Sequence, residues 1–120
     1  MSWKTSAESD KKDEAGVWHV SAEEAAEQMA EEKDFVIVDV REAAHFEREH
    51  IKGALSIPAS DIDEERPAAL PDLKQPLYLY CTNGICSKIA AERLAEMGYE
   101  NVSEMGAVGD WKGEMETGEE

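Results

Sequence analysis

Short apolar runs alternate along this chain with segments whose apolar residues repeat at helical spacing. We predict strands at 17–20, 35–40, 54–57, 76–80 and 101–105. The run over 35–40 is the strongest, because it is apolar almost throughout, as in a strand that is covered on both faces.

Helices are expected between these strands. Ser21 and Glu24 match a capping box, and they precede a predicted apolar face made of Ala22, Ala25, Ala26, Met29 and Ala30. Further helices are predicted at 42–50 and 87–97, with short helical segments near 59–65 and 110–112. One face of the helix predicted at 87–97 is expected to carry Ala90, Leu94 and Met97, together with Cys86 at its start.

Alternation of strand and helix predicts an α/β domain with three layers and a central parallel sheet of about five strands. We place this domain at residues 17–112. Residues 1–16 are polar and charged, and we expect a flexible N-terminal tail there; residues 113–120 are expected to form an acidic C-terminal tail.

Composition narrows the class of protein. The chain has 120 residues, which suits one domain, and its net charge is −16. This charge disfavours nucleic acids and anionic membrane surfaces as partners, since both need basic patches. We predict a cytoplasmic protein for three reasons. The chain has only two cysteines, its N-terminus does not resemble a signal peptide, and it lacks a long apolar segment.

The most informative stretch runs from Leu79 to Lys88. Cys81 follows a predicted buried strand, a short loop with Gly84 comes next, and a helix begins directly after. Loop amides and the positive end of a helix then point at one sulfur, which favours the reactive thiolate.

Three kinds of chemistry commonly use a cysteine in a loop of this kind. Phosphatases of the tyrosine-phosphatase type need an arginine six residues after the cysteine, where this chain has Ser87. Thioredoxin-type dithiols need C-x-x-C, whereas Cys81 and Cys86 are separated by four residues. Sulfur transfer through a cysteine persulfide fits best, because inward N–H groups stabilise that anion.

Other polar residues are candidates for supporting roles. Asp39 interrupts the strongest strand near its end, and Arg41 is the nearest cation in sequence. This pair is either a structural salt bridge or part of a pocket at the strand ends, and the sequence leaves both open. His45 and His50 lack the spacing of a helical metal pair and are interpreted as structural, so no metal is expected.

Three motifs in order resemble the single-domain rhodanese family of sulfurtransferases across nearly all of 17–112. The first comprises Val38-Asp39-Val40-Arg41-Glu42 with His50-Ile51-Lys52-Gly53-Ala54. The second is the loop from Cys81 to Ser87, which is similar to the family's active-site pattern C-x-x-G-x-R-S. The third comprises Gly98-Tyr99 and Asn101-Val102 with a cluster of glycines and Trp111.

The resemblance implies a role for each matching residue. Cys81 would carry the persulfide, surrounded by the amides of a binding loop formed by Thr82, Asn83, Gly84, Ile85 and Cys86. Asp39 and Arg41 would brace the fold near the site, and His50 and Gly53 would be structural. No cofactor or metal is implied.

Cys86 departs from the family pattern, because many members carry arginine there. That arginine would attract an anionic donor such as thiosulfate. Cys86 has two interpretations: a small residue packed at the helix start, or a resolving thiol that attacks the Cys81 persulfide and leaves a Cys81–Cys86 disulfide.

The sequence therefore predicts a rhodanese-type sulfurtransferase. Its partners would be a small sulfur donor (thiosulfate, polysulfide or a low-molecular-weight persulfide) and a thiol or cyanide-like acceptor, with a sulfur-carrier protein as a further candidate. Two alternatives remain: a redox or sulfide-releasing protein using Cys81 and Cys86, and a non-catalytic rhodanese-like binding module.

Overall fold

The central sheet of the protein has five strands, and all of its strand pairs are parallel. The computed structural model describes residues 16–31, 34–62 and 66–117. In the order in which they lie in the sheet, the strands are β1 (Val17–His19), β6 (Val102–Ala107), β5 (Leu77–Cys81), β2 (Val36–Asp39) and β4 (Leu55–Ser56). The five-stranded parallel sheet expected from the sequence is confirmed.

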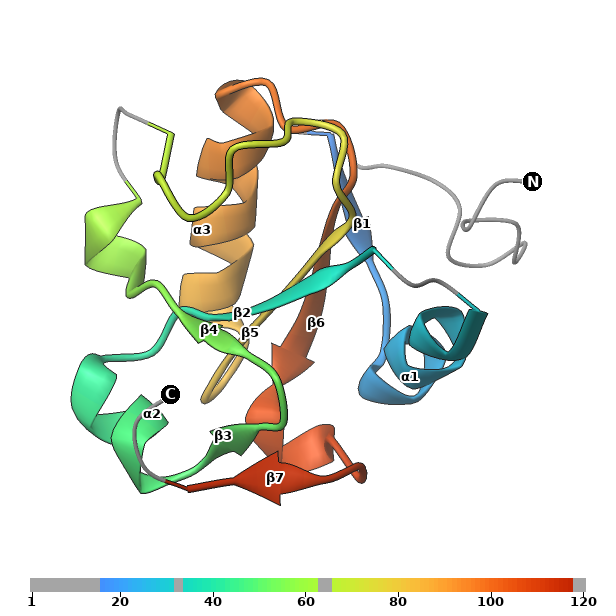
Figure 1. Cartoon of the computed structure of the whole chain (residues 1–120), viewed down its shortest axis with the longest axis vertical. Coiled ribbons are helices and arrows are strands. Elements are labelled where there is room, and N and C mark those ends of the chain that lie inside the picture. The colour runs from blue at the N-terminus through green and yellow to red at the C-terminus, as the bar shows by residue number, and fades with distance from the viewer. Residues whose placement is uncertain (1–15, 32–33, 63–65, 118–120) are drawn as a thin grey trace.

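Helices cover both faces of this sheet, which gives the expected three layers. The helix α3 (Ile85–Glu96) lies on one side and α1 (Ala22–Glu31) on the other (Figure 1). The side chains of the central strand alternate accordingly. Leu77 and Leu79 join the core cluster that contains Leu94 of α3, whereas Tyr78 and Tyr80 join the cluster that contains Ala25 of α1.

Smaller elements complete the layers. The helix α2 (Ala43–Arg48) buries Phe46 in the same cluster as Tyr78 and Tyr80. The 3-10 helix η1 (Ala59–Asp61) contacts α3. A second 3-10 helix, η2 (Val108–Asp110), follows β6, so the short helix expected at 110–112 begins earlier than predicted. Trp111, just after it, packs against the core.

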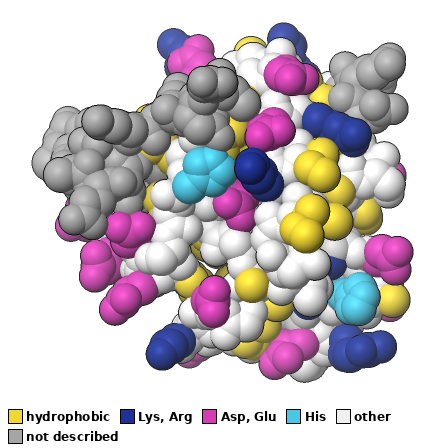
Figure 2. Space-filling view, turned by 180° about the vertical axis from the view of Figure 1, so that it is seen from behind, with side chains coloured by type: hydrophobic (Ala, Val, Ile, Leu, Met, Phe, Trp, Pro, Cys, Tyr) yellow, Lys and Arg dark blue, Asp and Glu magenta, His cyan; other side chains and the backbone are white. Residues whose placement is uncertain are grey.

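Acidic side chains are spread over the surface. Figure 2 shows them across one whole face of the molecule, with lysine and arginine side chains between them. Since the chain carries a net charge of −16, its surface presents a diffuse negative field. Such a field disfavours the approach of anions to any site on the protein.

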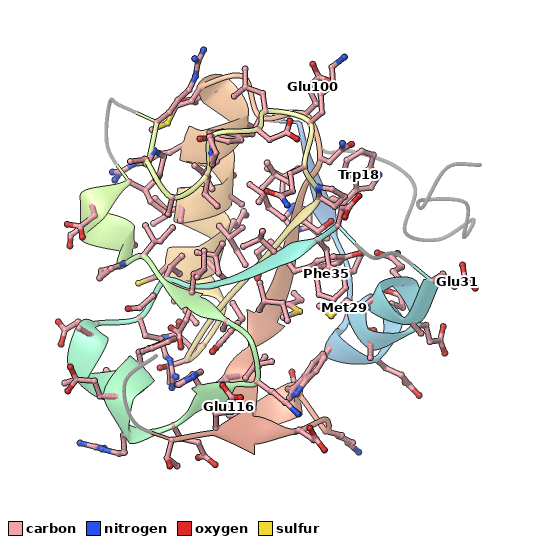
Figure 3. All side chains as sticks on the ribbon, viewed as in Figure 1. Trp18, Met29, Glu31, Phe35, Glu100 and Glu116 are labelled. Carbon is pink, nitrogen blue, oxygen red and sulfur yellow. The ribbon has the colours of Figure 1, made fainter. Side chains whose placement is uncertain are left out.

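The predicted capping box of α1 is present. The Ser21 hydroxyl accepts a hydrogen bond from the Glu24 amide at 3.0 Å, and the Glu24 carboxylate accepts one from the Ser21 amide at 3.0 Å. The buried face of α1 differs from the prediction, because Ala26 and Ala30 are exposed and Gln28 is buried. The Gln28 side chain accepts a hydrogen bond from the Tyr78 hydroxyl at 2.9 Å, which makes a polar residue tolerable there. Met29 of the same helix lies beside Phe35 (Figure 3).

The C-terminal boundary predicted at residue 112 is wrong. Residues 113–117 are described, and within them β7 (Met115–Glu116) pairs antiparallel with β3 (His50–Ile51). Glu116 (Figure 3) accepts a hydrogen bond from the Gly53 amide and lies 3.4 Å from Nε2 of the buried His50. These contacts tie the segment to the α2–β4 connection. Of the tails expected at 1–16 and 113–120, residues 1–15 and 118–120 lie outside the described residues.

Candidate active site

Cys81 is the last residue of the central strand, at the carboxyl end of the parallel sheet. An open pocket of about 320 Å³ lies there. It is lined by Val40, Arg41, Glu42, His45, Pro58, Ala59, Ser60, Cys81, Thr82, Asn83 and Cys86. Parallel α/β sheets commonly bind their ligands at this edge. The sequence-predicted residues Arg41, Cys81, Thr82, Asn83 and Cys86 therefore come together around one pocket.

The Cys81 sulfur receives hydrogen bonds from two backbone amides. The Gly84 amide donates to Sγ at 3.0 Å and the Ser87 amide at 3.3 Å. Ser87 lies one residue beyond the expected range of 82–86, while the amide of Ile85 donates to Asn83 Oδ1 at 3.0 Å. Because the Cys81 side chain is buried, these N–H groups replace water as partners of a sulfur anion.

Gly84 makes this arrangement of amides sterically accessible. Its φ of +87° lies in the left-handed region, which side chains with a Cβ rarely adopt. A Cβ there would also lie 3.5 Å from the Gly106 Cα. The turn at Gly84 lets α3 begin at Ile85, two residues before the predicted start. The positive end of the helix therefore lies beside the sulfur.

Strand β6 is irregular next to Cys81. Leu79 pairs with Glu104, but Cys81 pairs with Ala107, so the register shifts between these two pairs. Bulges of this kind re-aim side chains and are common beside functional sites. Here the shift lies between Glu104 and Ala107, alongside the end of β5.

The pairing predicted between Asp39 and Arg41 is present and is buried. The Arg41 guanidinium donates to both Asp39 oxygens, with Nη2 2.7 Å from Oδ2, and the Arg41 amide donates to Oδ1 at 2.9 Å. Burial alone would lower the pKa of Arg41, but the hydrogen bonds and the charge of Asp39 outweigh it, so the pKa is raised. Arg41 also donates to the Glu49 carbonyl, which connects the end of β2 to the end of α2.

Tyr80 is a third residue of this hydrogen-bonded network, and the sequence did not indicate it. Its hydroxyl donates to Asp39 Oδ2 at 2.7 Å and accepts from the Ile51 amide at 3.0 Å. Burial, together with the hydrogen bond to Asp39, raises the pKa of Tyr80. Asp39 and Tyr80 together thus link β2, β5 and β3 next to Arg41, which lines the pocket.

Two further residues behind the sulfur were missed. The Ser87 hydroxyl lies 3.5 Å from Cys81 Sγ and donates to Glu104 Oε2 at 2.8 Å; Glu104 Oε1 lies 3.1 Å from His19 Nδ1. Glu104 lies within a predicted strand, as Asp39 does, and that position was visible in the sequence.

Cys86 is exposed and lines the pocket, whereas Ala90 and Leu94, which were predicted on the same helix face, are buried. It lies in the first turn of α3. Within the described residues, no group of three or more His, Cys, Asp or Glu side chains is placed to hold a metal ion. In the same part of the chain, no helix has the length and apolar character needed to cross a membrane.

Comparisons with known proteins place this chain in a family. The model of the rhodanese-like domain matches residues 21–114. The thiosulfate sulfurtransferase PspE of Escherichia coli (strain K12) is 37% identical over 73 residues, covering 61% of this chain and 70% of the relative. The thiosulfate sulfurtransferase GlpE of Coxiella burnetii (strain RSA 331 / Henzerling II) is 35% identical over 86 residues, covering 71% of this chain and 78% of the relative.

A solved structure agrees with these matches. A rhodanese with anions from E. coli superposes with a TM-score of 0.65 at 33% sequence identity, covering 70% of this chain and 99% of that chain. Sheet order, helix placement and a cysteine surrounded by loop amides define an α/β enzyme of the rhodanese type. This chain belongs to the rhodanese-like domain family.

Proposed function

We propose that this rhodanese-type sulfurtransferase moves sulfane sulfur from a small donor to a thiol or cyanide-like acceptor through a persulfide on Cys81. The observation that supports this most directly is the environment of Cys81. Its sulfur accepts hydrogen bonds from the amides of Gly84 and Ser87, and the residue lines the pocket at the strand ends. Both relatives above are named as thiosulfate sulfurtransferases.

The proposed reaction has two displacements. The Cys81 thiolate attacks the outer sulfur of the donor, the donor's S–S bond breaks, and the remainder leaves with the bonding electron pair; from thiosulfate this is sulfite. The terminal sulfur of the Cys81 persulfide is then attacked by the acceptor, and Cys81 leaves as a thiolate. The Cys81 thiolate and the Cys81 persulfide both carry negative charge on sulfur. The same amides and the start of α3 stabilise both of them.

Asp39 and Arg41 would support this site without reacting. Arg41 lines the pocket, but its charge is balanced by Asp39. Glu42 and His45 line the same pocket, and Lys88 is exposed on α3 and does not line it. The pocket therefore favours weakly charged donors, such as a low-molecular-weight persulfide, over thiosulfate.

A sulfur-carrier protein is a second candidate acceptor. Ile85 and Ile89 of α3 are 62% and 44% exposed, and they flank Cys86 beside the pocket. Exposed apolar side chains next to a reactive group suit contact with another protein. The cytoplasmic, reducing setting predicted from the two cysteines fits either acceptor, and it stays a prediction.

A sulfide-releasing reaction is favoured by one observation: Cys86 is exposed and lines the same pocket as Cys81. In this reaction the Cys86 thiolate attacks Cys81 Sγ in the persulfide. A Cys81–Cys86 disulfide forms, and hydrosulfide leaves with the electron pair. A low-molecular-weight thiol would then reduce the disulfide and reset the protein.

Intact-protein mass spectrometry after exposure to thiosulfate or polysulfide tests the proposed function. We expect the chain to gain one sulfur atom, located at Cys81 by peptide mapping, and to lose it when cyanide is added. If Cys86 is a resolving thiol, Cys86→Ser accumulates more persulfide than the unaltered chain, because the release step is blocked. Equal persulfide in both proteins would leave Cys86 without that role, and no sulfur gain from any donor would refute sulfur transfer itself.

Introducing the cation that the family pattern carries is expected to change donor preference. In Cys86→Arg, the kcat/KM for thiosulfate should rise about 10-fold to 100-fold, since a hydrogen bond to a charged group contributes about 1.5–3 kcal/mol. Steady-state assays with thiosulfate and with a neutral organic trisulfide measure the effect. Cys86→Gln is the matched control, because it adds polar bulk without charge. Equal gains in both variants, or none in Cys86→Arg, would contradict the electrostatic explanation.

A further inference from the structure

Glu104 is a buried carboxylate behind Cys81 that the proposed reaction leaves without a role. It lies on β6 and is only 8% exposed. Its two oxygens have different partners: Oε2 accepts from the Ser87 hydroxyl at 2.8 Å, and Oε1 lies 3.1 Å from His19 Nδ1. Glu104 lines a second cavity, of about 810 Å³, which lies between α1 and the segment after β6. It therefore stands between the sulfur site and another opening to solvent.

The Ser87 hydroxyl connects Glu104 to the sulfur. Ser87 has a single hydroxyl proton and three acceptors near it: Glu104 Oε2 at 2.8 Å, the Gly84 carbonyl at 3.2 Å and Cys81 Sγ at 3.5 Å. An ionised carboxylate at the shortest distance is the strongest acceptor of the three. With its proton on that side, Ser87 Oγ presents lone pairs to the sulfur, and the Cys81 S–H donates to them.

We propose that Glu104 is a positioning residue that takes up the Cys81 proton through the Ser87 hydroxyl. The S–H bond of Cys81 breaks as its proton passes to Ser87 Oγ. The original hydroxyl proton of Ser87 passes at the same time to Glu104 Oε2. The products are a thiolate, a serine hydroxyl that now donates to it, and a neutral carboxylic acid. No charge is created in the step, and no group besides these three is needed.

His19 is the partner of the other Glu104 oxygen. It pairs with Glu104 across neighbouring strands, where His19 and Glu104 are register partners, and its side chain is 41% exposed. The thiolate is thus generated on the pocket side, while its proton stays on Glu104, on the far side of Ser87.

This route answers an electrostatic difficulty of the site. A simple ionisation of Cys81 would leave a thiolate and the Glu104 carboxylate on either side of Ser87, and like charges this close disfavour each other. Moving the proton to Glu104 keeps one negative charge instead of two. The other titratable or charged groups that line the two cavities are Arg41, Glu42, His45 and Cys86 on the side of Cys81, and Glu23, Asp110 and Lys112 on the side of Glu104.

The shape of a pH profile tests this inference, which rests on the proposed function only in taking Cys81 as the nucleophile. Cys81 is alkylated with iodoacetamide, a small neutral reagent, in a Cys86→Ser background so that one thiol reports. With the relay, the rate should stay nearly level over the pH range in which Glu104 and Cys81 hold one proton between them, because the internal transfer does not depend on pH. In Glu104→Gln the amide cannot take the proton, and the rate should rise about 10-fold per pH unit over the same interval.

Controls separate the relay from charge and from folding. Glu42→Gln removes a carboxylate that lines the pocket, so it is expected to shift the curve along the pH axis without changing its shape. Ser87→Ala breaks the connection independently and should reproduce the steep profile; it decides the question alone if Glu104→Gln does not fold. A steep rise in the Cys86→Ser background itself, parallel to that of Glu104→Gln, would overturn the relay. Because alkylation uses no sulfur donor, this outcome is independent of the sulfur-loading experiment.

Discussion

Cys81→Ser is expected to gain no sulfur from any donor, and its rate of sulfur transfer should fall by on the order of 10³-fold or more. The amides of Gly84 and Ser87 stabilise an anion at this position, but a serine hydroxyl stays protonated at neutral pH and is a poor nucleophile toward sulfur. Intact-protein mass spectrometry measures loading, and sulfite release from thiosulfate measures the first displacement.

The matched control is Cys86→Ser, which makes the same substitution within the same pocket and should still load sulfur. Both variants should unfold at nearly the temperature of the unaltered chain, since serine is close to cysteine in size. Sulfur found on Cys86 of the Cys81→Ser variant, at a comparable rate, would move the nucleophile to the exposed cysteine. That result would contradict the proposed reaction while leaving the family unchanged.

The sheet could be predicted from the sequence because its strands are local patterns. The apolar runs that became β2 and β5 are short, bounded by polar residues and followed by helical periodicity, so each could be recognised without its neighbours. The two-residue strands β3 and β7 could not. They pair His50 with Glu116 across most of the chain, and neither lies in an apolar run of the kind that predicted the equally short β4.

The contacts of the candidate site are also of two kinds, local ones that the sequence could predict and tertiary ones that it could not. Cys81, Gly84 and the start of α3 form a continuous segment, so their meeting followed from the strand–loop–helix pattern alone. The contacts behind the sulfur depend on tertiary structure. Glu104 reaches Ser87 only because β6 lies next to β5 and its register shifts beside Cys81. The exposure of Cys86 depended on where the first turn of α3 lies, and helix ends are the least certain part of a sequence-based assignment.

Asp39→Ala is expected to destabilise the fold by about 3–5 kcal/mol, because removing one partner of a buried ion pair leaves the other charge uncompensated. The Asp39 side chain is fully buried and accepts hydrogen bonds from both Arg41 and Tyr80. The alanine variant would also leave the Tyr80 hydroxyl without this acceptor. Urea unfolding at neutral pH measures the change, and the m-value should stay the same if the unfolded state is unaffected.

Two comparisons show whether the loss comes from this network. Asp61→Ala removes an exposed aspartate from η1 and should change stability by no more than about 0.5 kcal/mol. Tyr80→Phe removes the hydroxyl that connects Asp39 to the Ile51 amide, and its effect should be smaller in the Asp39→Ala background than alone, since the two residues share one hydrogen bond. Additive losses would show that the Asp39–Tyr80 hydrogen bond contributes little to stability. An Asp39→Ala variant as stable as Asp61→Ala would show the same of the Asp39–Arg41 pair. Asp39 and Arg41 would then act only on the geometry of the pocket, and the effect of Asp39→Ala would have to appear in kcat.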